Sequence, residues 1–482
     1  MGNLADRGAT EKNSVPRSEA TSPPLLTVDN PNAPRSRSIR NFAVFILCNV
    51  VLVNLAILAG DRLLATHFAN PQTLPGIAPT FFVLSGHQGN DSLGVMLPVV
   101  HAFQRDPNAH IYESAFFEQH TKFQYPLTSL LPVYGLMRLG ASDTTISQIF
   151  KAIAFLSVGL TIYLCFRLAQ RLLRRCRTAD FRADLSRTDQ AILAAAFVLG
   201  GLFYYPLVSG LSLGQIQAVL TCGFTVAFLC WISGHELAAS IVMGLMTAVK
   251  PQYGLFFVWA LARRKFGIAA AGLCCLGIIG AVSLAVFGWH NNVEYFHVLR
   301  YIAPRGEGFF ENQSVNGLLN RLTFNGNNMT WDANSFAPQN TIVSAGTTIS
   351  SLLLLGLALF YRWGKDRAGS AIDFACMILA STMASPVAWV HHYAILLPVL
   401  VWLWFGDYGS RNSRWSMSML AIAYILMSNK CTTANFLAPL PVWNLLQSYF
   451  YFATILVLIL LLKSNNDTHE NHLSPASPET AP

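Results

Sequence analysis

The fold is decided by stretches such as FAVFILCNVVLVNLAILAG, residues 42–60, which contain no charged side chain. Comparable runs without Asp, Glu, Lys or Arg cover residues 191–206, 268–287 and 388–405. At about 1.5 Å per residue, each run crosses most or all of a hydrocarbon core about 30 Å thick. Backbone polar groups in lipid must be satisfied within their own segment, so these runs predict transmembrane helices.

The composition of the whole chain agrees with this prediction. Of the 482 residues, 53% are apolar and 12% are charged, and the mean hydropathy is +0.42. A soluble domain cannot hide that much apolar surface. The formal charge of +8 comes from Lys and Arg that lie mostly in short loops beside apolar runs, where they act as orientation signals. We therefore expect no nucleic-acid partner, and the nine scattered cysteines predict no disulfide framework.

The two ends of the chain differ from its middle. Residues 1–40 and 464–482 are rich in Ser, Pro, Asn and charge, which predicts disordered cytoplasmic tails around a transmembrane domain at 41–463. Arg35, Arg37 and Arg40 precede the first span, so the N-terminus is expected in the cytoplasm.

The basic loops set the number of crossings. If the short run at 125–140 is interfacial or re-entrant, every basic loop falls on the cytoplasmic side. The fold class that follows is an all-α polytopic membrane protein with about 12 transmembrane helices, counted with a window of roughly 20 residues. The expected spans start near Phe42, Ile146, Asp189, Gln215, Glu236, Pro251, Phe266, Thr341, Ala371, Val387, Ser416 and Ser448.

Two segments are expected to depart from simple spans. Residues 91–103, in the first outer loop, carry apolar side chains at helical spacing and predict an interfacial helix. Residues 236–249 and 251–262 are short apolar runs, which also suit a broken hairpin that turns at Lys250 without crossing fully.

Unusual polar residues gather on the outer side in this topology, and each has a structural alternative. Asp91 is also well placed to cap its helix. Lys250 is also placed to extend from a helix end toward the lipid headgroups. Gln215 and Asn312 also suit hydrogen bonds between helices. Adjacent residues on a helix point about 100° apart, so His391 and His392 predict one ring facing a cavity and one packing, without a two-histidine metal site.

Four pieces of sequence, taken in chain order, carry a resemblance. They are GNDS at 89–92 with IY at 111–112 and FQYP at 123–126; GQIQ at 214–217 with KP at 250–251; NQSVNG at 312–317 with RL at 321–322; and SPVAWVHH at 385–392. Together they resemble glycosyltransferase family 87, the polyprenol-phosphate-sugar-dependent mannosyltransferase-like membrane proteins of the GT-C superfamily. Leu127, Gln217 and Val390 depart from the usual family pattern.

The resemblance implies a GT-C architecture in which the first outer loop supplies an acidic residue, here Asp91. The expected reaction moves a sugar, mannose or another hexose or pentose, from a polyprenyl-phosphate donor to a glycan or glycolipid acceptor. One carboxylate suffices for a single displacement with inversion, so Asp91 is expected to be the general base. Neither a cofactor nor a metal is expected.

The remaining site residues are expected to bind the donor and the acceptor. Lys250, His391 and His392 would hold the donor phosphate. The sugar or the acceptor is assigned to Tyr125, Gln215, Asn312 and Gln313. The protein would be a multi-pass component of a bacterial plasma membrane, in contact with membrane lipid, with its active site facing the periplasm or exterior.

Two other classes of function remain open at this point. A transporter or lipid flippase would need polar residues through the bilayer midplane and an internal repeat, and neither is clear. A lipid-linked glycan ligase or polymerase would use paired Arg and His of an outer loop, for which His297, Arg300 and Arg305 are available.

Overall fold

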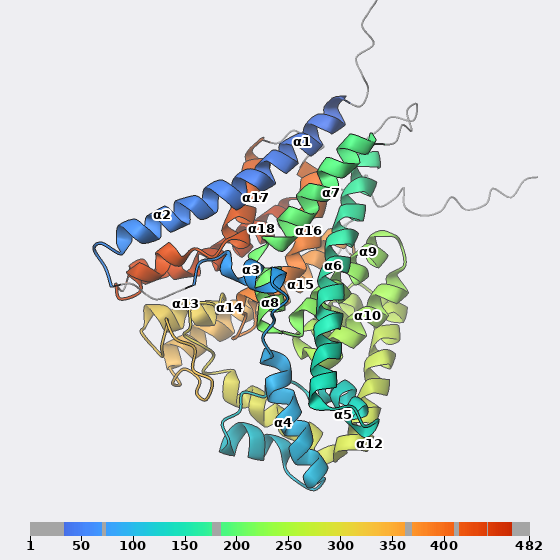
Figure 1. The fold of residues 1–482 in the computed structure, drawn as a ribbon. Coiled ribbons are helices and arrows are strands. Elements are labelled where there is room, and N and C mark those ends of the chain that lie inside the picture. The colour runs from blue at the N-terminus through green and yellow to red at the C-terminus, as the bar shows by residue number, and fades with distance from the viewer. Residues whose placement is uncertain are drawn as a thin grey trace, which may run out of the picture.

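The computed structural model describes residues 33–69, 74–175, 185–361, 369–408, 414–440 and 442–464. Within these residues the chain is built from helices, and its one extended pairing is an isolated bridge between Asn312 and Trp389 (Figure 1). The predicted all-α class is therefore confirmed.

Five continuous helical segments are long and apolar enough to cross a membrane. They are the α1–η1–α2 segment (α1 Ala33–Cys48, η1 Asn49–Val53, α2 Asn54–Leu64), α6 (Asp143–Arg175), α12 (Phe266–Ile302), α14 (Thr341–Phe360) and the η8–α18 segment (η8 Trp443–Ser448, α18 Tyr449–Lys463). A sixth candidate is the pair of α7 (Arg187–Leu202) and α8 (Tyr205–Leu213), which is bent by 55°. Exposed Leu352 and Leu353 on α14 show the apolar surface that such helices present to lipid.

The other predicted spans are shorter. They are α9 (Gln217–Ile232), α10 (Glu236–Val249), α11 (Leu255–Ala262), α15 (Ala371–Met383), the η5–α16–η6 segment (η5 Val390–Ile395, α16 Leu396–Trp402, η6 Leu403–Tyr408) and α17 (Arg414–Ser428). The polytopic helical fold is confirmed, while the described residues contain five or six full-length candidates where the sequence predicted about 12. Several apolar runs bend or break inside the protein, which a hydropathy window does not detect.

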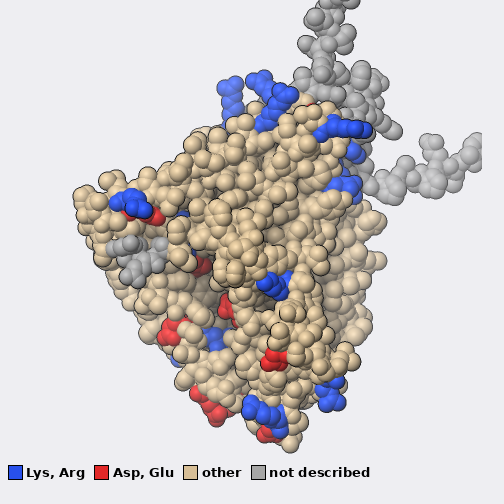
Figure 2. Space-filling model, viewed as in Figure 1, with Lys and Arg blue, Asp and Glu red and all other residues tan. Residues whose placement is uncertain are grey.

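The charged side chains differ between two ends of the molecule: on the face shown in Figure 2, one end carries Lys and Arg alone, whereas the other carries both signs of charge. On one face, Lys and Arg gather beside the ends of α1 and α7, and the visible Asp and Glu lie elsewhere (Figure 2). We call this the basic end; it includes Arg171 and Arg187. The opposite end, which we call the loop end, contains residues 65–69, 74–142, 303–340 and 432–437. Basic residues at 177, 362–367 and 411–413 belong to loops predicted on the cytoplasmic side. These positions lie outside the described residues.

A hairpin with Lys250 at its turn is confirmed. The chain runs through α10, the 3₁₀ turn η4 (Pro251–Gly254) and α11 (Leu255–Ala262). The Nζ of Lys265, just after α11, lies 2.8 Å from a carboxylate oxygen of Glu236 at the start of α10, so the two helices return to the same end. Lys250 is extended, with φ −132° and ψ 101°, as expected for a residue that precedes proline.

The loop end is made of short helices packed on one another. They are α3 (Ala78–Leu84), α4 (Asp91–Arg105), η2 (Glu113–Glu118), η3 (Leu127–Leu130), α5 (Leu131–Arg138), α13 (Val315–Leu322) and η7 (Thr432–Leu437). A helix over residues 91–103 is confirmed as α4, whose apolar face is buried within the protein at Leu93, Met96, Leu97, Val100 and Phe103. Its place at a membrane interface stays a prediction. With 8 residues, α5 is too short to cross a membrane, so residues 125–140 do not form a span.

The boundary of the N-terminal tail differs from the prediction. Helix α1 begins at Ala33, inside the segment predicted as a tail to residue 40. Pro34 is compatible with this start, because proline is tolerated in the first turn of a helix. The rest of that tail and residues 465–482 lie outside the described residues.

Candidate active site

A close backbone contact places the start of α4 against the α8–α9 turn. The backbone N–H of Gly89 donates to the carbonyl of Ser212 at 2.7 Å. A Cβ atom at Gly89 would lie 2.7 Å from the carbonyl oxygen of Leu213, and Gly214 has a φ of +72°. Both positions therefore need glycine. This contact brings Asp91, the first residue of α4, beside Gln215.

Asp91 belongs to a hydrogen-bonded group that the sequence predicted in part. The side-chain amide of Gln215 donates to the Asp91 carboxylate. The Tyr125 hydroxyl donates to the Gln215 carbonyl oxygen at 3.2 Å and lies 3.0 Å from Ser92 Oγ. Ser92 also accepts from the backbone N–H of Ile216 at 3.0 Å. Asp91, Tyr125 and Gln215 are thus brought together, and the Asp91 carboxylate is held from outside its own helix.

The environment of Asp91 changes its acidity. Burial raises its pKa above the usual value of 3.8, while the Gln215 hydrogen bond and the charge of Lys250 act in the opposite direction. The effect of Lys250 shows that the carboxylate and the ammonium group lie in one electrostatic neighbourhood.

Lys250 is buried at the turn of the hairpin. Its Nζ donates to the Gln217 carbonyl oxygen at 2.9 Å and lies 2.7 Å from His392 Nε2. A lysine ammonium has three donors and no acceptor, so His392 Nε2 accepts and its proton belongs on Nδ1. Only 7% of Lys250 is exposed, so it does not extend to the headgroup region as the structural alternative required.

His391 and His392 lie in η5 with their rings edge to face, at 4.9 Å between centroids. Both ring nitrogens of His391 are buried, and neither has a hydrogen-bond partner among the described residues. His392 therefore contacts Lys250, while His391 keeps two unused polar atoms. Which ring faces a substrate stays a prediction.

Asn312 and Gln313 are buried and hold segments of the protein together. The Asn312 side chain donates to the carbonyls of Glu307 at 2.9 Å and Pro386 at 3.0 Å, and accepts from the Ala388 N–H at 2.9 Å. The amide group of Gln313 donates to the carbonyls of Phe310 and Gln447, and its oxygen accepts from the N–H of Tyr451 at 3.0 Å. Their assignment as sugar ligands stays a prediction, since their present contacts are with the protein itself.

Several residues around this site were not predicted from the sequence to have a role in it. Gln217 stood in the quoted GQIQ motif but was given no role, although it holds Lys250. Glu311 accepts from the Tyr205 hydroxyl at 2.9 Å and pairs with Lys430 at 3.1 Å. A lone Lys after an apolar helix was the available signal for Lys430.

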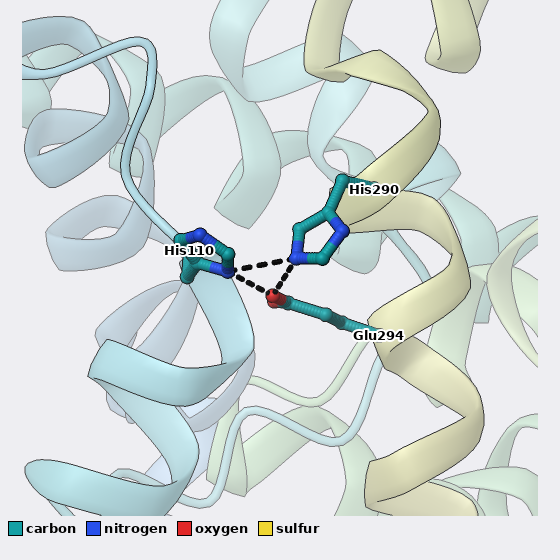
Figure 3. A group of neighbouring side chains, drawn as sticks. All are labelled: His110, His290 and Glu294. Carbon is teal, nitrogen blue, oxygen red and sulfur yellow. Dashed lines mark hydrogen bonds and ion pairs between the residues drawn. The ribbon is translucent and has the colours of Figure 1, made fainter.

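Among the described residues, the group of His, Cys, Asp and Glu side chains with a metal-ligating arrangement is His110, His290 and Glu294 (Figure 3). It includes no residue of the Asp91 and Lys250 neighbourhood.

The fold and the site define a helical membrane protein in which a part-buried carboxylate and buried ammonium and imidazole groups lie where the helices meet the loop end. A model of glycosyltransferase family 87 matches residues 123–386, more than half of the 482 residues. The chain belongs to this family, as the resemblance indicated. Tyr125, Gln215 and Lys250 lie within the matched residues, whereas Asp91 and His391 lie outside them.

Similar proteins are known from mycobacteria. A polyprenol-phosphate-mannose-dependent alpha-(1-2)-phosphatidylinositol mannoside mannosyltransferase of Mycobacterium tuberculosis is 27% identical over 248 residues, 51% of this chain and 53% of the relative. A corresponding phosphatidylinositol pentamannoside mannosyltransferase of Mycolicibacterium smegmatis is 26% identical over 340 residues, 66% of this chain and 72% of the relative. The chain thus spans about half the length of the first relative. No solved structure matches it.

Proposed function

We propose that this protein transfers a mannosyl group from a polyprenyl-phosphate donor to a hydroxyl group of a glycolipid or glycan, in the plasma membrane of a bacterium. Its family membership and the activities for which its relatives are named support the reaction class and the donor. The observation that carries the proposal is that the buried Lys250 donates to Gln217, two residues after the Gln215 that donates to the part-buried Asp91 carboxylate.

Asp91 is the general base of the proposed step. It accepts the proton of the acceptor hydroxyl while the acceptor oxygen forms a bond to the anomeric carbon. The bond from that carbon to the phosphate oxygen breaks, and its electron pair leaves with polyprenyl phosphate. A single displacement of this kind inverts the anomeric configuration. Burial favours the base role because a raised pKa makes a carboxylate more basic, and the Gln215 hydrogen bond keeps it oriented.

Lys250 stabilises the departing phosphate. Hydrogen bonds to Gln217 and His392 use two of its three donors, which leaves one N–H for a phosphate oxygen. The charge that develops on the leaving group is met by an ammonium in a site from which water is largely excluded, where such interactions are strongest. His391, with two buried ring nitrogens and no partner among the described residues, is the next candidate to contact the donor.

The amide residues have two kinds of role in this proposal. Gln215 and Tyr125 border the carboxylate and are placed to contact a sugar or acceptor hydroxyl. Asn312 bridges to the backbone around Ala388 and thereby positions the segment that leads into the histidine pair. We expect Asn312 and Gln313 to act by holding this segment in place.

We also propose that the site faces away from the cytoplasm. The basic end carries the Lys and Arg that mark cytoplasmic loops, whereas Asp91 begins a helix of the loop end. A membrane-impermeant thiol reagent tests this proposal in a cysteine-free variant. Asp106→Cys should react in spheroplasts, and Arg171→Cys only after the membrane is opened. The reverse pattern would overturn the proposed sidedness.

The ligase and transporter alternatives have less support. The Arg305 guanidinium lies 3.9 Å from the centre of the Tyr301 ring and donates to the Tyr301 carbonyl, so it is already engaged within the protein. His297 and Arg300 are exposed on α12. Membership of glycosyltransferase family 87 favours sugar transfer over both alternatives.

The base is tested by Asp91→Asn in purified protein supplied with polyprenyl-phosphate mannose and a mycobacterial glycolipid fraction. We expect transfer to fall by about 10²- to 10⁴-fold, because the change removes the proton acceptor and nearly preserves shape. The matched control is Asp106→Asn, an exposed aspartate that directly follows the same helix, which should keep wild-type turnover. Undiminished transfer by Asp91→Asn would remove Asp91 from the mechanism.

A further inference from the structure

Three side chains from two separate segments meet at the loop end (Figure 3). His110 comes from the first outer loop after α4, while His290 and Glu294 lie one helical turn apart on α12. His110 Nδ1 is 2.5 Å from Glu294 Oε1, His290 Nε2 is 2.9 Å from the same oxygen, and the two nitrogens are 2.8 Å apart. One potential ligand atom from each residue therefore points at a common centre.

Hydrogen bonds alone cannot account for all three short distances between these two nitrogens and the oxygen. A hydrogen bond along each edge would need three protons, whereas the two facing nitrogens carry at most one each. If both are protonated, two N–H groups oppose each other; if one is protonated, one edge joins two lone pairs. A cation at the centre accepts a lone pair from all three atoms at once.

Burial of the carboxylate adds an independent observation. Glu294 is only 7% exposed, and its Oε2 is buried without a hydrogen-bond partner among the described residues. An ionised carboxylate at such a position needs a compensating positive charge. The side chains of His110 and His290 are 57% and 69% exposed, so a metal ion and a solvent ligand have access from the outside.

The backbone that carries these ligands is fixed on both segments. The Asn291 side chain accepts from the backbone N–H of Ile111 at 2.9 Å and donates to the carbonyl of Ala109 at 3.2 Å. It therefore holds the residues on either side of His110. Gly288, with φ 77° and ψ 163°, kinks α12 two residues before His290 and separates the membrane part of the helix from the part that bears the ligands.

We propose that His110, His290 and Glu294 bind a first-row divalent cation, with Zn²⁺ as the representative ion. Imidazole nitrogen and carboxylate oxygen are ligands that zinc prefers, and three protein ligands leave a fourth position for water. Ligand atoms around a tetrahedral zinc, at about 2.0–2.1 Å from the metal, are roughly 3.3 Å apart. Each side chain needs to move outward by well under about 1 Å from its present position.

The bound ion has a structural role. It ties the first outer loop, which follows the helix of Asp91, to α12. His110 lies five residues beyond the C-terminal end of α4, the helix that begins at Asp91, and none of the three ligands belongs to the Asp91 and Lys250 neighbourhood. The proposal does not depend on the glycosyltransferase reaction.

Zinc uptake tests the site directly. Full-length protein without a polyhistidine tag is purified in detergent, stripped with a chelator, exposed to Zn²⁺ and desalted before its metal content is measured. We expect about one zinc per chain in the wild type, and at least a tenfold weaker affinity in His290→Ala and Glu294→Gln. His297→Ala is the matched control, because it removes an exposed histidine from the same helix outside the cluster.

Thermal unfolding provides the second readout. Zinc should raise the melting temperature of the wild type and of His297→Ala in a concentration-dependent way, and should leave that of His290→Ala unchanged. Because His290 is mostly exposed, its replacement should not prevent folding, which gel filtration checks. Equal zinc content in wild type and His290→Ala, or no zinc uptake by a monodisperse wild type, would show a hydrogen-bonded triad only and overturn the proposal.

Discussion

Lys122 and Lys250 are both buried lysines, and their surroundings differ in one respect. Lys122 forms an ion pair with Glu307, and its Nζ lies 4.3 Å from the centre of the Phe336 ring. Lys250 donates to Gln217 and His392, which are neutral in that arrangement. One ammonium group is neutralised at contact distance, and the other is surrounded by dipoles.

The difference indicates two uses of a buried charge. The Lys122 pair joins the segment after α4 to the segment after α12, so the charge of Lys122 is neutralised by a contact that stabilises the tertiary structure. A buried cation without a carboxylate at contact distance retains the capacity to bind an anion, and such groups are common at functional sites. The same reasoning separates Lys250 from Arg263, which pairs with Asp373 at 2.6 Å at the basic end.

Lys122→Met gives the largest expected effect, on stability. Removing one partner of a buried ion pair leaves Glu307 uncompensated, and we expect the free energy of unfolding to fall by about 3–5 kcal/mol. Denaturation in detergent measures it, with exposed Arg138→Met as the control, expected within about 0.5 kcal/mol of wild type. The double variant with Glu307→Gln should recover part of the loss. A single variant as stable as wild type would contradict the structural role.

Lys250→Met should have the opposite result, with a large loss of transfer activity and a small loss of stability. We expect transfer to fall by about 10²- to 10³-fold, because the charge that meets the leaving phosphate is lost. Stability should change by only about 1 kcal/mol, since the partners lost are neutral. Transfer assays and denaturation on the same preparation measure both. If Lys250→Met loses as much stability as Lys122→Met and keeps its specific activity, the two lysines do not differ in the proposed way.

The pH dependence of transfer sharpens the comparison further. Asp91 must be ionised to act as a base, so the rate should fall as pH drops through its pKa, which burial places above the usual 3.8. Gln215→Leu removes a hydrogen bond that lowers this pKa, so the acidic limb should move to higher pH. The pH profile of transfer at low donor concentration measures the limb. Tyr125→Phe is the control, and an unchanged limb in Gln215→Leu would contradict the assignment.

The smallest expected effect is that of Tyr125→Phe on rate. Its hydroxyl hydrogen-bonds to Gln215 at 3.2 Å and contacts Ser92, one step removed from the carboxylate. Loss of one such hydrogen bond corresponds to about 0.5–1.5 kcal/mol, or roughly 2- to 13-fold in transfer. Steady-state rates in the same assay test this value. A loss as large as that of Asp91→Asn would place the tyrosine in direct contact with the reacting atoms.

Local patterns in the sequence predicted the parts of the fold that depend on neighbouring residues. The apolar spacing at 91–103 indicated α4, and the short runs on either side of Lys250 and Pro251 indicated the hairpin. Among the described residues five or six helical segments are long and apolar enough to cross a membrane, where the sequence predicted about 12 spans, because hydropathy measures apolar content and does not detect where a helix such as α7 bends into α8. Buried apolar helices and lipid-facing helices have similar composition, and only their packing tells them apart.

The sequence predicted which residues belong to the candidate site, but it did not predict which of them contact one another. Asp91 and Gln215 are separated by 124 positions, and Lys250 and His392 by 142, so their proximity depends on the whole arrangement of helices. The same is true of Asn312, which the sequence suggested as a sugar ligand and whose side chain is hydrogen-bonded in the structure to Glu307, Ser314 and the 386–388 segment. Gln217 was passed over for the same reason, since its partner is 33 residues away.

By itself the sequence determined that this chain enters a membrane as helices, which polar residues interrupt those helices and which family it resembles, because hydropathy and short motifs are local properties. Only the tertiary structure decided which buried charges neutralise one another and which stay available to a ligand. The physical reason is that the energy of a buried charge depends on the groups within a few ångströms of it, and those groups come from distant parts of the chain.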